Sequence, residues 1–227
     1  MEKIRFVVAS RAGRDDFFAK TATGKSLSMY DFPFLEIELY PENRDGLAKI
    51  YNTAIDNSRD DPAILVFAHD DLHITDYFWA DQVRGALARF QLAGLAGNRR
   101  RVPKQPGWPF VDDKFTWDSR DNLSGVVGHG KTFPPANISF YGEPCQEVKL
   151  LDGMLLMTRS TTLIEHGLRF DERFTFHFYD MDLCRQAELQ GISMGTWRLP
   201  VIHESGGSFG SEAWKEAYRA YLEKWKD

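Results

Sequence analysis

Two carboxylates and an imidazole directly follow a short hydrophobic run in the first third of the chain. The run extends from Ile64 to Ala68, and His69, Asp70 and Asp71 come after it. A run of apolar residues of this length is typical of a strand that is buried on both faces of an α/β sheet. Because ligands of open α/β sheets bind beyond the carboxyl ends of the strands, this position indicates a metal or phosphate site.

The direction of the side chains separates the three residues. If the extended conformation continues past Ala68, His69 and Asp71 point to one side and Asp70 to the other. We therefore take His69 and Asp71 as candidate metal ligands. The alternative is an ordinary turn after the strand, because Asp and His are common in such turns. This stretch alone leaves both interpretations open.

Two places in the second half of the chain could contribute to the same site. A predicted strand at 197–202 ends at His203, and Asp180 and Asp182 lie at the start of a predicted helix. A carboxylate and a neutral imidazole suit Mg²⁺ or Mn²⁺ that is held mainly by substrate phosphates. We select Asp71 and His203 as the pair that best fits this requirement.

The two aspartates of the predicted helix are not expected to face the same way, because they are two residues apart. Asp182 can pair with Arg185, which favours a structural role for it, and an Asp at a helix start is also explained by capping. Asp180 remains as the candidate base, able to take a proton from an attacking hydroxyl group if burial raises its pKa. We keep Asp182 beside it as the second catalytic candidate.

The composition excludes several classes of protein. The 227 residues, 43% of them hydrophobic and 27% charged, fit one globular α/β domain. A net charge of -5 provides no basic face for nucleic acid or for an anionic membrane surface. No apolar run has the length of a transmembrane helix and no signal peptide precedes the first predicted strand, so we expect a cytoplasmic protein. The two cysteines lack metal or disulfide spacing and are assigned no chemistry.

The order of predicted elements indicates a Rossmann-like α/β fold with a mainly parallel central sheet flanked by helices. Hydrophobic strands are expected at 4–9, 34–40 and 64–68, and an amphipathic helix at 47–55. A strand, a helix and a second strand in this order form a right-handed crossover unit of a parallel sheet. Later strands are expected at 92–97, 122–130, 147–151, 154–157 and 197–202, and later helices at about 76–90, 161–167, 180–191 and 214–225.

The stretch from 99 to 146 is long, aromatic and proline-rich. A connection of this length in a compact domain is usually a lid or a binding loop. Its three arginines, Arg99 to Arg101, could hold a phosphate, although a run of like charge is more often a solvated loop.

Six short motifs occur in the order found in one family of enzymes. The motifs lie at 43–52, beginning Asn-Arg-Asp-Gly-Leu-Ala, and at His69-Asp70-Asp71, Leu151-Asp152-Gly153, Phe170–Phe174, Tyr179–Cys184 and His203–Ser208. In this order they resemble the family 2-like glycosyltransferases of the GT-A fold. The chain is most similar to a short bacterial subgroup of sugar transferases in surface or capsule polysaccharide synthesis, and the resemblance covers nearly all of it.

The resemblance implies a nucleotide-sugar donor, a glycan or lipid-linked acceptor, and Mn²⁺ or Mg²⁺ on the donor diphosphate. It also implies a single displacement that inverts the anomeric carbon. By analogy, Asp71 corresponds to the last Asp of the D-x-D motif, Asp180 to the Asp of the base motif, and His203 to the downstream metal or phosphate ligand. His69 stands where D-x-D has its first Asp, and Tyr179 stands where the base motif has Glu.

Further residues are assigned to the two substrates. Donor contacts are expected from Ser10, Arg11, Asn43, Asn52 and Asp70, and acceptor contacts from Trp108, Asp152 and Gly153. The single GT-A-like domain of residues 1–227 then has a nucleotide-binding half at 1–98, the loop region at 99–146, and an acceptor and catalytic half at 147–227. No acidic residue near position 40 corresponds to the one that often contacts a uridine base, so the nucleotide stays open.

Two other functions are compatible with the same residues. A metal-dependent phosphoester hydrolase would use the carboxylates on water, although such enzymes normally have a denser cluster that holds two metal ions. A catalytically silent nucleotide-sugar or glycan-binding module is compatible with His69 and Tyr179 at the two altered motif positions. The sugar, the nucleotide, the acceptor and the oligomeric state are not determined by the sequence.

Overall fold

The first hydrophobic strands are parallel, as the crossover pattern predicts. In the computed structural model, β1 (Ile4–Ala9), β2 (Leu35–Tyr40) and β3 (Ile64–Ala68) lie side by side with β1 in the middle. Helix α3 (Leu47–Asn57) joins β2 to β3 and packs against β1. All five residues of β3 are buried, which explains why the first polar side chain is that of His69, just after the strand.

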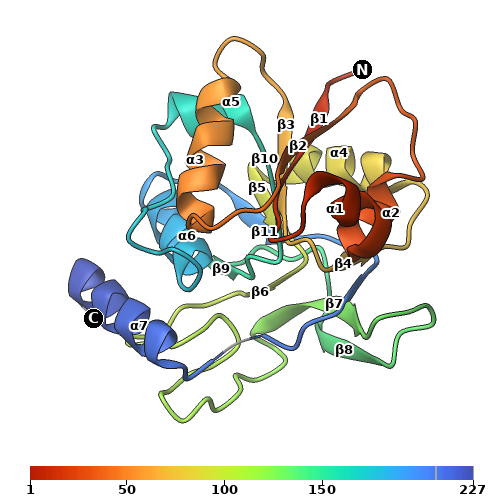
Figure 1. The fold of residues 1–227 in the computed structure, drawn as a ribbon. Coiled ribbons are helices and arrows are strands. Elements are labelled where there is room, and N and C mark those ends of the chain that lie inside the picture. Colours follow the sequence, from red (N-terminus) through yellow and green to blue (C-terminus); the bar gives the residue numbers. More distant parts are fainter. Residues whose placement is uncertain (208, 227) are drawn as a thin grey trace.

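Three more strands complete a mixed sheet with the order β11-β5-β10-β3-β1-β2. β5 (Leu92–Gly94) is parallel to β11 (Met194–Thr196), and β10 (Leu155–Arg159) runs antiparallel between β3 and β5. The prediction of a mainly parallel central sheet is therefore correct except at β10. Helices α3 and α5 (Ser160–Glu165) lie on one side of this sheet and α4 (Trp79–Arg89) on the other (Figure 1).

A second mixed sheet lies beyond the carboxyl ends of β1 and β3 (Figure 1). Its order is β4-β12-β7-β6-β9, and β8 pairs with β7. The strands are β4 (Leu72–Ile74), β6 (Ala96–Asn98), β7 (Leu123–His129), β8 (Asn137–Gly142), β9 (Leu150–Leu151) and β12 (Val201–His203). The antiparallel pairing of β4 with β12 sets Leu72 opposite His203, so the end of β12 lies beside the turn that follows β3.

Two predicted strands are wrong, because neither range forms one continuous strand. The stretch 92–97 breaks at Leu95 into β5 and β6. The stretch 197–202 is not one strand, since β11 ends at Thr196 and β12 begins at Val201. Strands of three residues are too short for their hydrophobic period to reveal a change of sheet.

Other elements have no counterpart in the sequence prediction. Helices α1 (Arg14–Lys20) and α2 (Ala22–Leu27) follow the loop after β1, and β8 lies within the region 99–146 beside the expected strand β7. The hydroxyl of Thr23 in α2 donates to the carbonyl of His69 at 2.7 Å and accepts from the amide of Leu72 at 3.0 Å. Helix α2 therefore holds the turn that carries the candidate ligands.

Two helices follow β10 and α5 in the last quarter of the chain. α6 (Tyr179–Leu189) packs against β9 and β11, and α7 (Glu212–Trp225) is the last element of the chain.

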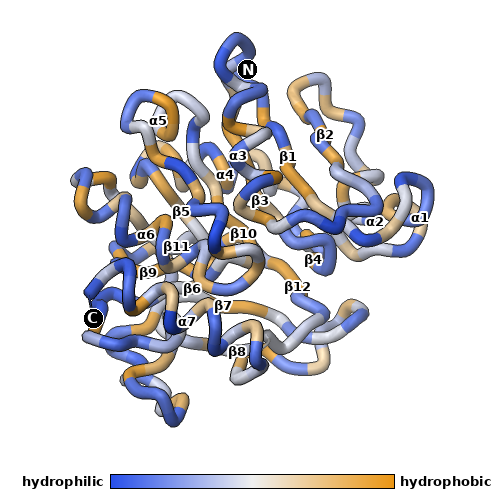
Figure 2. The backbone as a smooth tube through the Cα atoms, turned by 60° about the vertical axis from the view of Figure 1, so that its left-hand side comes forward, coloured by the Kyte–Doolittle hydropathy of each residue, from blue (hydrophilic) through white to orange (hydrophobic). Residues whose placement is uncertain are grey.

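The structure describes residues 1–207 and 209–226, so Ser208, which ends the motif from His203, lies outside the described residues, as does Asp227. Figure 2 shows hydrophobic stretches along the inner strands and hydrophilic stretches in the outer loops. Over the described residues, no helix combines the length and hydrophobicity that a membrane span requires.

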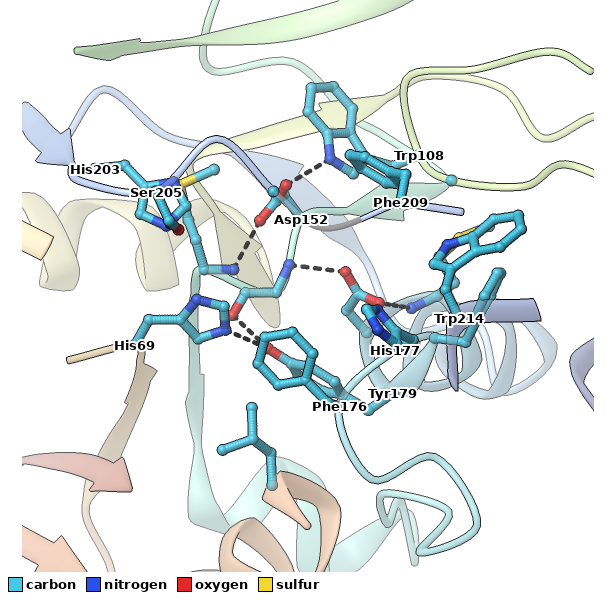
Figure 3. Close-up of a pocket in the computed structure, with 18 of the residues that line it drawn as sticks. His69, Trp108, Asp152, Phe176, His177, Tyr179, His203, Ser205, Phe209 and Trp214 are labelled. Atoms are coloured by element: carbon cyan, nitrogen blue, oxygen red, sulfur yellow. Dashed lines mark hydrogen bonds between the residues drawn. The ribbon is translucent and has the colours of Figure 1, made fainter. Parts of the chain in front are cut away.

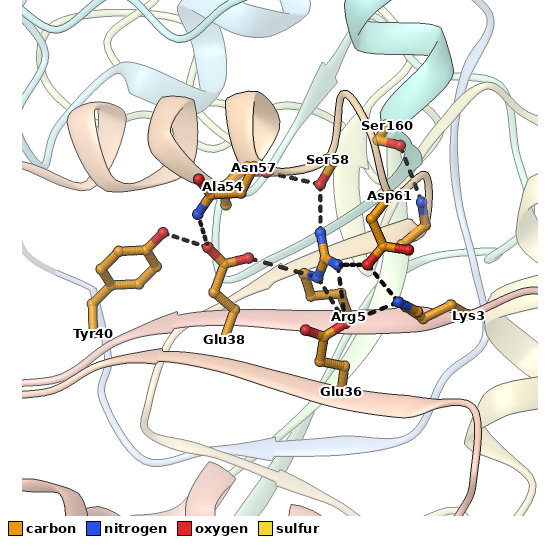
Figure 4. A network of polar contacts seen from close by, with 11 residues as sticks. Lys3, Arg5, Glu36, Glu38, Tyr40, Ala54, Asn57, Ser58, Asp61 and Ser160 are labelled. Atoms are coloured by element: carbon orange, nitrogen blue, oxygen red, sulfur yellow. Dashed lines mark hydrogen bonds and ion pairs between the residues drawn. The ribbon is translucent and has the colours of Figure 1, made fainter.

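A buried arginine joins three elements at the amino end of β1 (Figure 4). Arg5 is 3% exposed, and its guanidinium donates to Glu36 of β2, to Ser58 after α3 and to Asp61 before β3, at 2.7 to 3.0 Å. A buried charge is stable only when it is paired and hydrogen-bonded. This network anchors the amino end of β1 to its neighbours. The candidate ligands lie at the opposite, carboxyl end, where Ser10 follows β1.

Candidate active site

A pocket of about 360 Å³ opens at the carboxyl ends of β1 and β3. Its wall includes the turn after β3, the turn before β10, the start of α6, the end of β12 and the loop around Trp108, which are distant from one another in sequence. Eight of the residues predicted from the sequence line it, namely His69, Asp70, Asp71, Trp108, Asp152, Gly153, Asp180 and His203. The three positions on which the sequence hypothesis depends, Asp71, Asp180 and His203, therefore share one cavity.

Two imidazoles and a carboxylate form a compact cluster in this pocket. One ligand atom each from His69, Asp71 and His203 lies within 4.8 Å of the other two. Nε2 of His203 is 3.3 Å from Oδ1 of Asp71, and this buried oxygen has no aligned hydrogen-bond donor. An oxygen and two imidazole nitrogens are suitable ligands for Mn²⁺ and related divalent ions. The residues therefore fit a single divalent cation.

Burial and mutual contact set the charges of the cluster. Burial lowers the pKa of His69, so this side chain is a neutral imidazole and able to bind a metal. Burial alone would raise the pKa of Asp71. The hydrogen bond and the charge of the neighbouring His203 have a larger opposite effect, so the pKa of Asp71 is lowered. Burial alone would lower the pKa of His203. The hydrogen bond and the negative charge of Asp71 have a larger opposite effect, so the pKa of His203 is raised. A metal ion would therefore compete with the proton of His203.

Asp180 lies across the pocket, in the first turn of α6. Its two carboxylate oxygens accept hydrogen bonds from the amide of Gly153 at 2.9 Å and from the amide of Met181 at 2.8 Å. Burial first, and then the negative charge of Asp152, raise the pKa of Asp180 to about 7. A carboxylate with this pKa can accept a proton near neutral pH, which is what a general base requires.

The backbone just before Asp180 has an uncommon conformation. Phe178, the residue that precedes α6, has φ +67°, which is rare for a bulky side chain. Its ring packs against Trp214 and Tyr221 of α7, with centroid distances of 5.5 Å and 5.1 Å. Strain of this kind persists at functional sites where surrounding packing holds it. Helix α7 thus supports the segment that directs Asp180 into the pocket.

Asp182 points away from the pocket, into the contact between α6 and α7. Its side chain is fully buried and accepts hydrogen bonds from Lys224 at 2.7 Å, Gln186 at 2.7 Å and the indole of Trp225 at 2.9 Å. It is not among the described residues that line the pocket. The two aspartates of α6 therefore face different ways, and the surroundings of Asp182 are those of an anchor between helices.

The predicted donor residues are only partly brought together. Asp70 lines the pocket and accepts a hydrogen bond of 2.5 Å from the hydroxyl of Ser10. Arg11 is exposed, and the Asn43 side chain donates to the carbonyl of Asp45. Of these, only Asp70 belongs to the described pocket lining.

Asn52 has a different environment, within the core under the pocket. It is buried, and its amide group donates to the carbonyl of Phe170 at 2.9 Å and to Glu172 at 3.0 Å, while it accepts from the amide of Phe170. Asn52 thereby ties α3 to the segment that leads into α6. It too is outside the lining formed by residues that the structure describes.

Aromatic residues surround the acceptor candidates. The indole of Trp108 donates to Asp152 at 2.5 Å, so the region 99–146 reaches the pocket through this side chain. Phe176, Phe209 and Trp214 also line the pocket (Figure 3), although the sequence did not identify the first two and assigned Trp214 to the core. Single aromatic residues in irregular segments carry no periodic signal that would have separated them from core residues.

Two of the three arginines in the run pair with acidic side chains. Arg100 makes two hydrogen bonds to Asp118, at 2.6 Å and 2.8 Å, and Arg101 pairs with Glu188 at 3.1 Å. Arg99 is exposed, and none of the three belongs to the pocket lining in the described part of the chain. The phosphate interpretation of this run therefore receives no support.

The fold and the pocket define an α/β protein with a cation-compatible site at the carboxyl ends of its strands. A family model described as a glycosyltransferase-like family matches residues 35–225. The chain belongs to this family, in agreement with the motif resemblance. No curated protein matches the chain.

Replacement of Asp182 separates an anchoring role from a catalytic one. Asp182→Ala should lower the free energy of unfolding by about 3 kcal/mol, because Lys224 and Trp225 lose a buried partner. Affinity for Mn²⁺ should be unchanged below the melting transition. Chemical denaturation and calorimetric titration measure the two quantities. Unchanged stability together with lost Mn²⁺ binding would contradict the anchoring role.

Proposed function

We propose that this protein transfers a sugar from a nucleotide-sugar donor to a hydroxyl group of a glycan or lipid-linked acceptor, with inversion at the anomeric carbon. The observation that carries the proposal is the presence of a cation-compatible cluster and a carboxylate with a raised pKa in the same pocket. Membership of a glycosyltransferase-like family supports it. The motif resemblance further suggests bacterial surface polysaccharide synthesis, in the cytoplasm.

Asp71, His203 and His69 would hold Mn²⁺ or Mg²⁺. When bound, the ion neutralises negative charge on the diphosphate that leaves the sugar. The buried Oδ1 oxygen of Asp71 supports this assignment, because it has no aligned hydrogen-bond donor and a buried polar atom without one is costly. Asp70 and Ser10, at the ends of β3 and β1, would contact the donor, and we assign the nucleotide to the half at 1–98.

Asp180 would act as the base on the other side of the anomeric carbon. It takes the proton of the acceptor hydroxyl as that oxygen forms the new bond to the sugar. The bond between the sugar and the diphosphate breaks in the same step, and its electron pair leaves with the phosphate oxygen. Asp152, held by Trp108, and Gly153 would position the acceptor, and we assign acceptor binding to the half at 147–227 and to part of 99–146.

The two alternative functions, a phosphoester hydrolase and a silent binding module, receive less support. The metal-compatible cluster found among the described residues contains one carboxylate, Asp71, whereas two-metal hydrolases rely on carboxylates that bridge the ions. A silent binding module would not need a carboxylate with a pKa of about 7 opposite the cluster, and Asp180 has one. Sugar transfer uses both features.

The direct test is Asp180→Asn in the presence of Mn²⁺ and a panel of nucleotide sugars with acceptor glycans. The substitution should lower kcat by about 100- to 10,000-fold, because no base remains, and should leave donor affinity unchanged. Asp45→Asn, at an exposed aspartate outside the described pocket lining, is the matched control. Full transfer by Asp180→Asn would refute the base. Hydrolysis of simple phosphate esters by the unmodified protein would favour the hydrolase.

The rate of transfer should also depend on pH in a defined direction. Asp180 acts only when deprotonated, and its pKa is raised to about 7, so the rate should increase as the pH rises through 7. Asp152→Asn removes a negative charge that raises this pKa and should shift the rising limb to lower pH. If the rate rises at the same pH in both proteins, a group other than Asp180 controls the pH dependence.

A further inference from the structure

A short chain of hydrogen bonds connects one wall of the pocket to the other. The hydroxyl of Tyr179, the first residue of α6, lies 2.8 Å from the carbonyl oxygen of Gly153 and 2.9 Å from Nε2 of His69 (Figure 3). His69 and Tyr179 are 110 residues apart in sequence. The contact therefore depends on the tertiary fold and not on a local turn.

The direction of these hydrogen bonds follows from the number of protons. A tyrosine hydroxyl has one proton to donate, and a carbonyl oxygen can only accept. The proton of Tyr179 therefore goes to Gly153, and His69 must donate its own proton through Nε2. A neutral imidazole carries one proton, so Nδ1 of His69 keeps a free lone pair. In Figure 3 this second ring nitrogen lies on the side of His203.

The hydroxyl of Tyr179 is held firmly in this position. The residue is 3% exposed, and its ring packs between Tyr51 and Phe170, at centroid distances of 5.8 Å and 6.0 Å. Burial raises the pKa of Tyr179 well above its ordinary value, so the hydroxyl keeps its proton. A Cβ atom at Gly153 would lie 2.3 Å from the hydroxyl oxygen. Only glycine at this position allows so close an approach.

The ring of His69 is also restrained from the outside. The Phe176 ring lies nearly parallel to it, with an interplanar angle of 21° and a centroid distance of 6.0 Å. Rotation of the imidazole about its own axis would break the hydrogen bond to Tyr179 and move Nδ1 away from the cluster with Asp71 and His203. Tyr179 and Phe176 together favour one orientation of the ring.

We propose that Tyr179 is a positioning residue that fixes His69 as the Nε2-protonated tautomer and presents Nδ1 to a divalent cation shared with Asp71 and His203. Tyr179 touches neither the cation nor the reacting atoms, and it acts through His69. The inference rests on the proposed function for the presence of the cation. Partners behind metal-binding histidines typically change metal affinity by 10- to 100-fold.

The test is Tyr179→Phe, which keeps the ring and removes the hydroxyl. Mn²⁺ affinity, measured by calorimetric titration of the full chain without nucleotide, should fall by about 10- to 100-fold. Tyr30→Phe is the matched control, because the Tyr30 hydroxyl also donates to a backbone carbonyl, that of Asp76 at 3.3 Å, but outside the described pocket lining. The control should bind Mn²⁺ as the unmodified protein does.

A second measurement does not depend on activity, and its first readout uses the unmodified protein. Nitrogen-15 NMR of the imidazole of His69 in the unmodified protein should show protonation at Nε2, and Tyr179→Phe should show a mixture of tautomers. Protonation at Nδ1 in the unmodified protein, or equal Mn²⁺ affinity in Tyr179→Phe, would overturn the proposal. Full transfer by Asp180→Asn would instead count against the proposed function and leave the assignment of the tautomer intact.

Discussion

The carboxylate of Asp71, whose Oδ1 oxygen is buried, is the constraint on which the site depends. Its Oδ1 atom lies 3.3 Å from His203 and has no aligned hydrogen-bond donor, so the pocket favours additional positive charge at this point. The backbone holds the two residues together, because β4 pairs with β12 and the amide of Glu204 donates to the carbonyl of Asp71 at 3.0 Å. Thr23 fixes the turn from the other side. The second sheet thus brings His203 beside the turn after β3 and completes the cluster.

Gly153 connects the two chemical parts of the pocket. Its amide donates to Asp180, and its carbonyl accepts from Tyr179, which in turn holds His69. One glycine therefore positions the proposed base and, through a tyrosine, a proposed metal ligand. The two positions at which this sequence departs from the family motifs, His69 and Tyr179, contact each other. The hydrogen bond of 2.9 Å between them places both departures in the same part of the pocket.

The sequence was sufficient for the features that depend on long hydrophobic patterns or on strand ends. The strand β3 has the predicted bounds, and the placement of Asp71 and His203 at strand ends leads directly to a shared pocket. The division of 92–97 between two sheets at Leu95 could not be predicted, because it depends on long-range pairing of three-residue strands. The hydrogen bond between Tyr179 and His69 could not be predicted either, since no local pattern relates residues that are 110 positions apart.

The most direct measurement of the central claim is an anomalous difference map from crystals of the protein grown with Mn²⁺. The account predicts one strong peak in the pocket, within roughly 2.0 to 2.6 Å of Asp71 and with His203 and Nδ1 of His69 as further ligands. A peak coordinated by Asp180 and Asp152 instead, or no peak near Asp71 at saturating Mn²⁺, would contradict it.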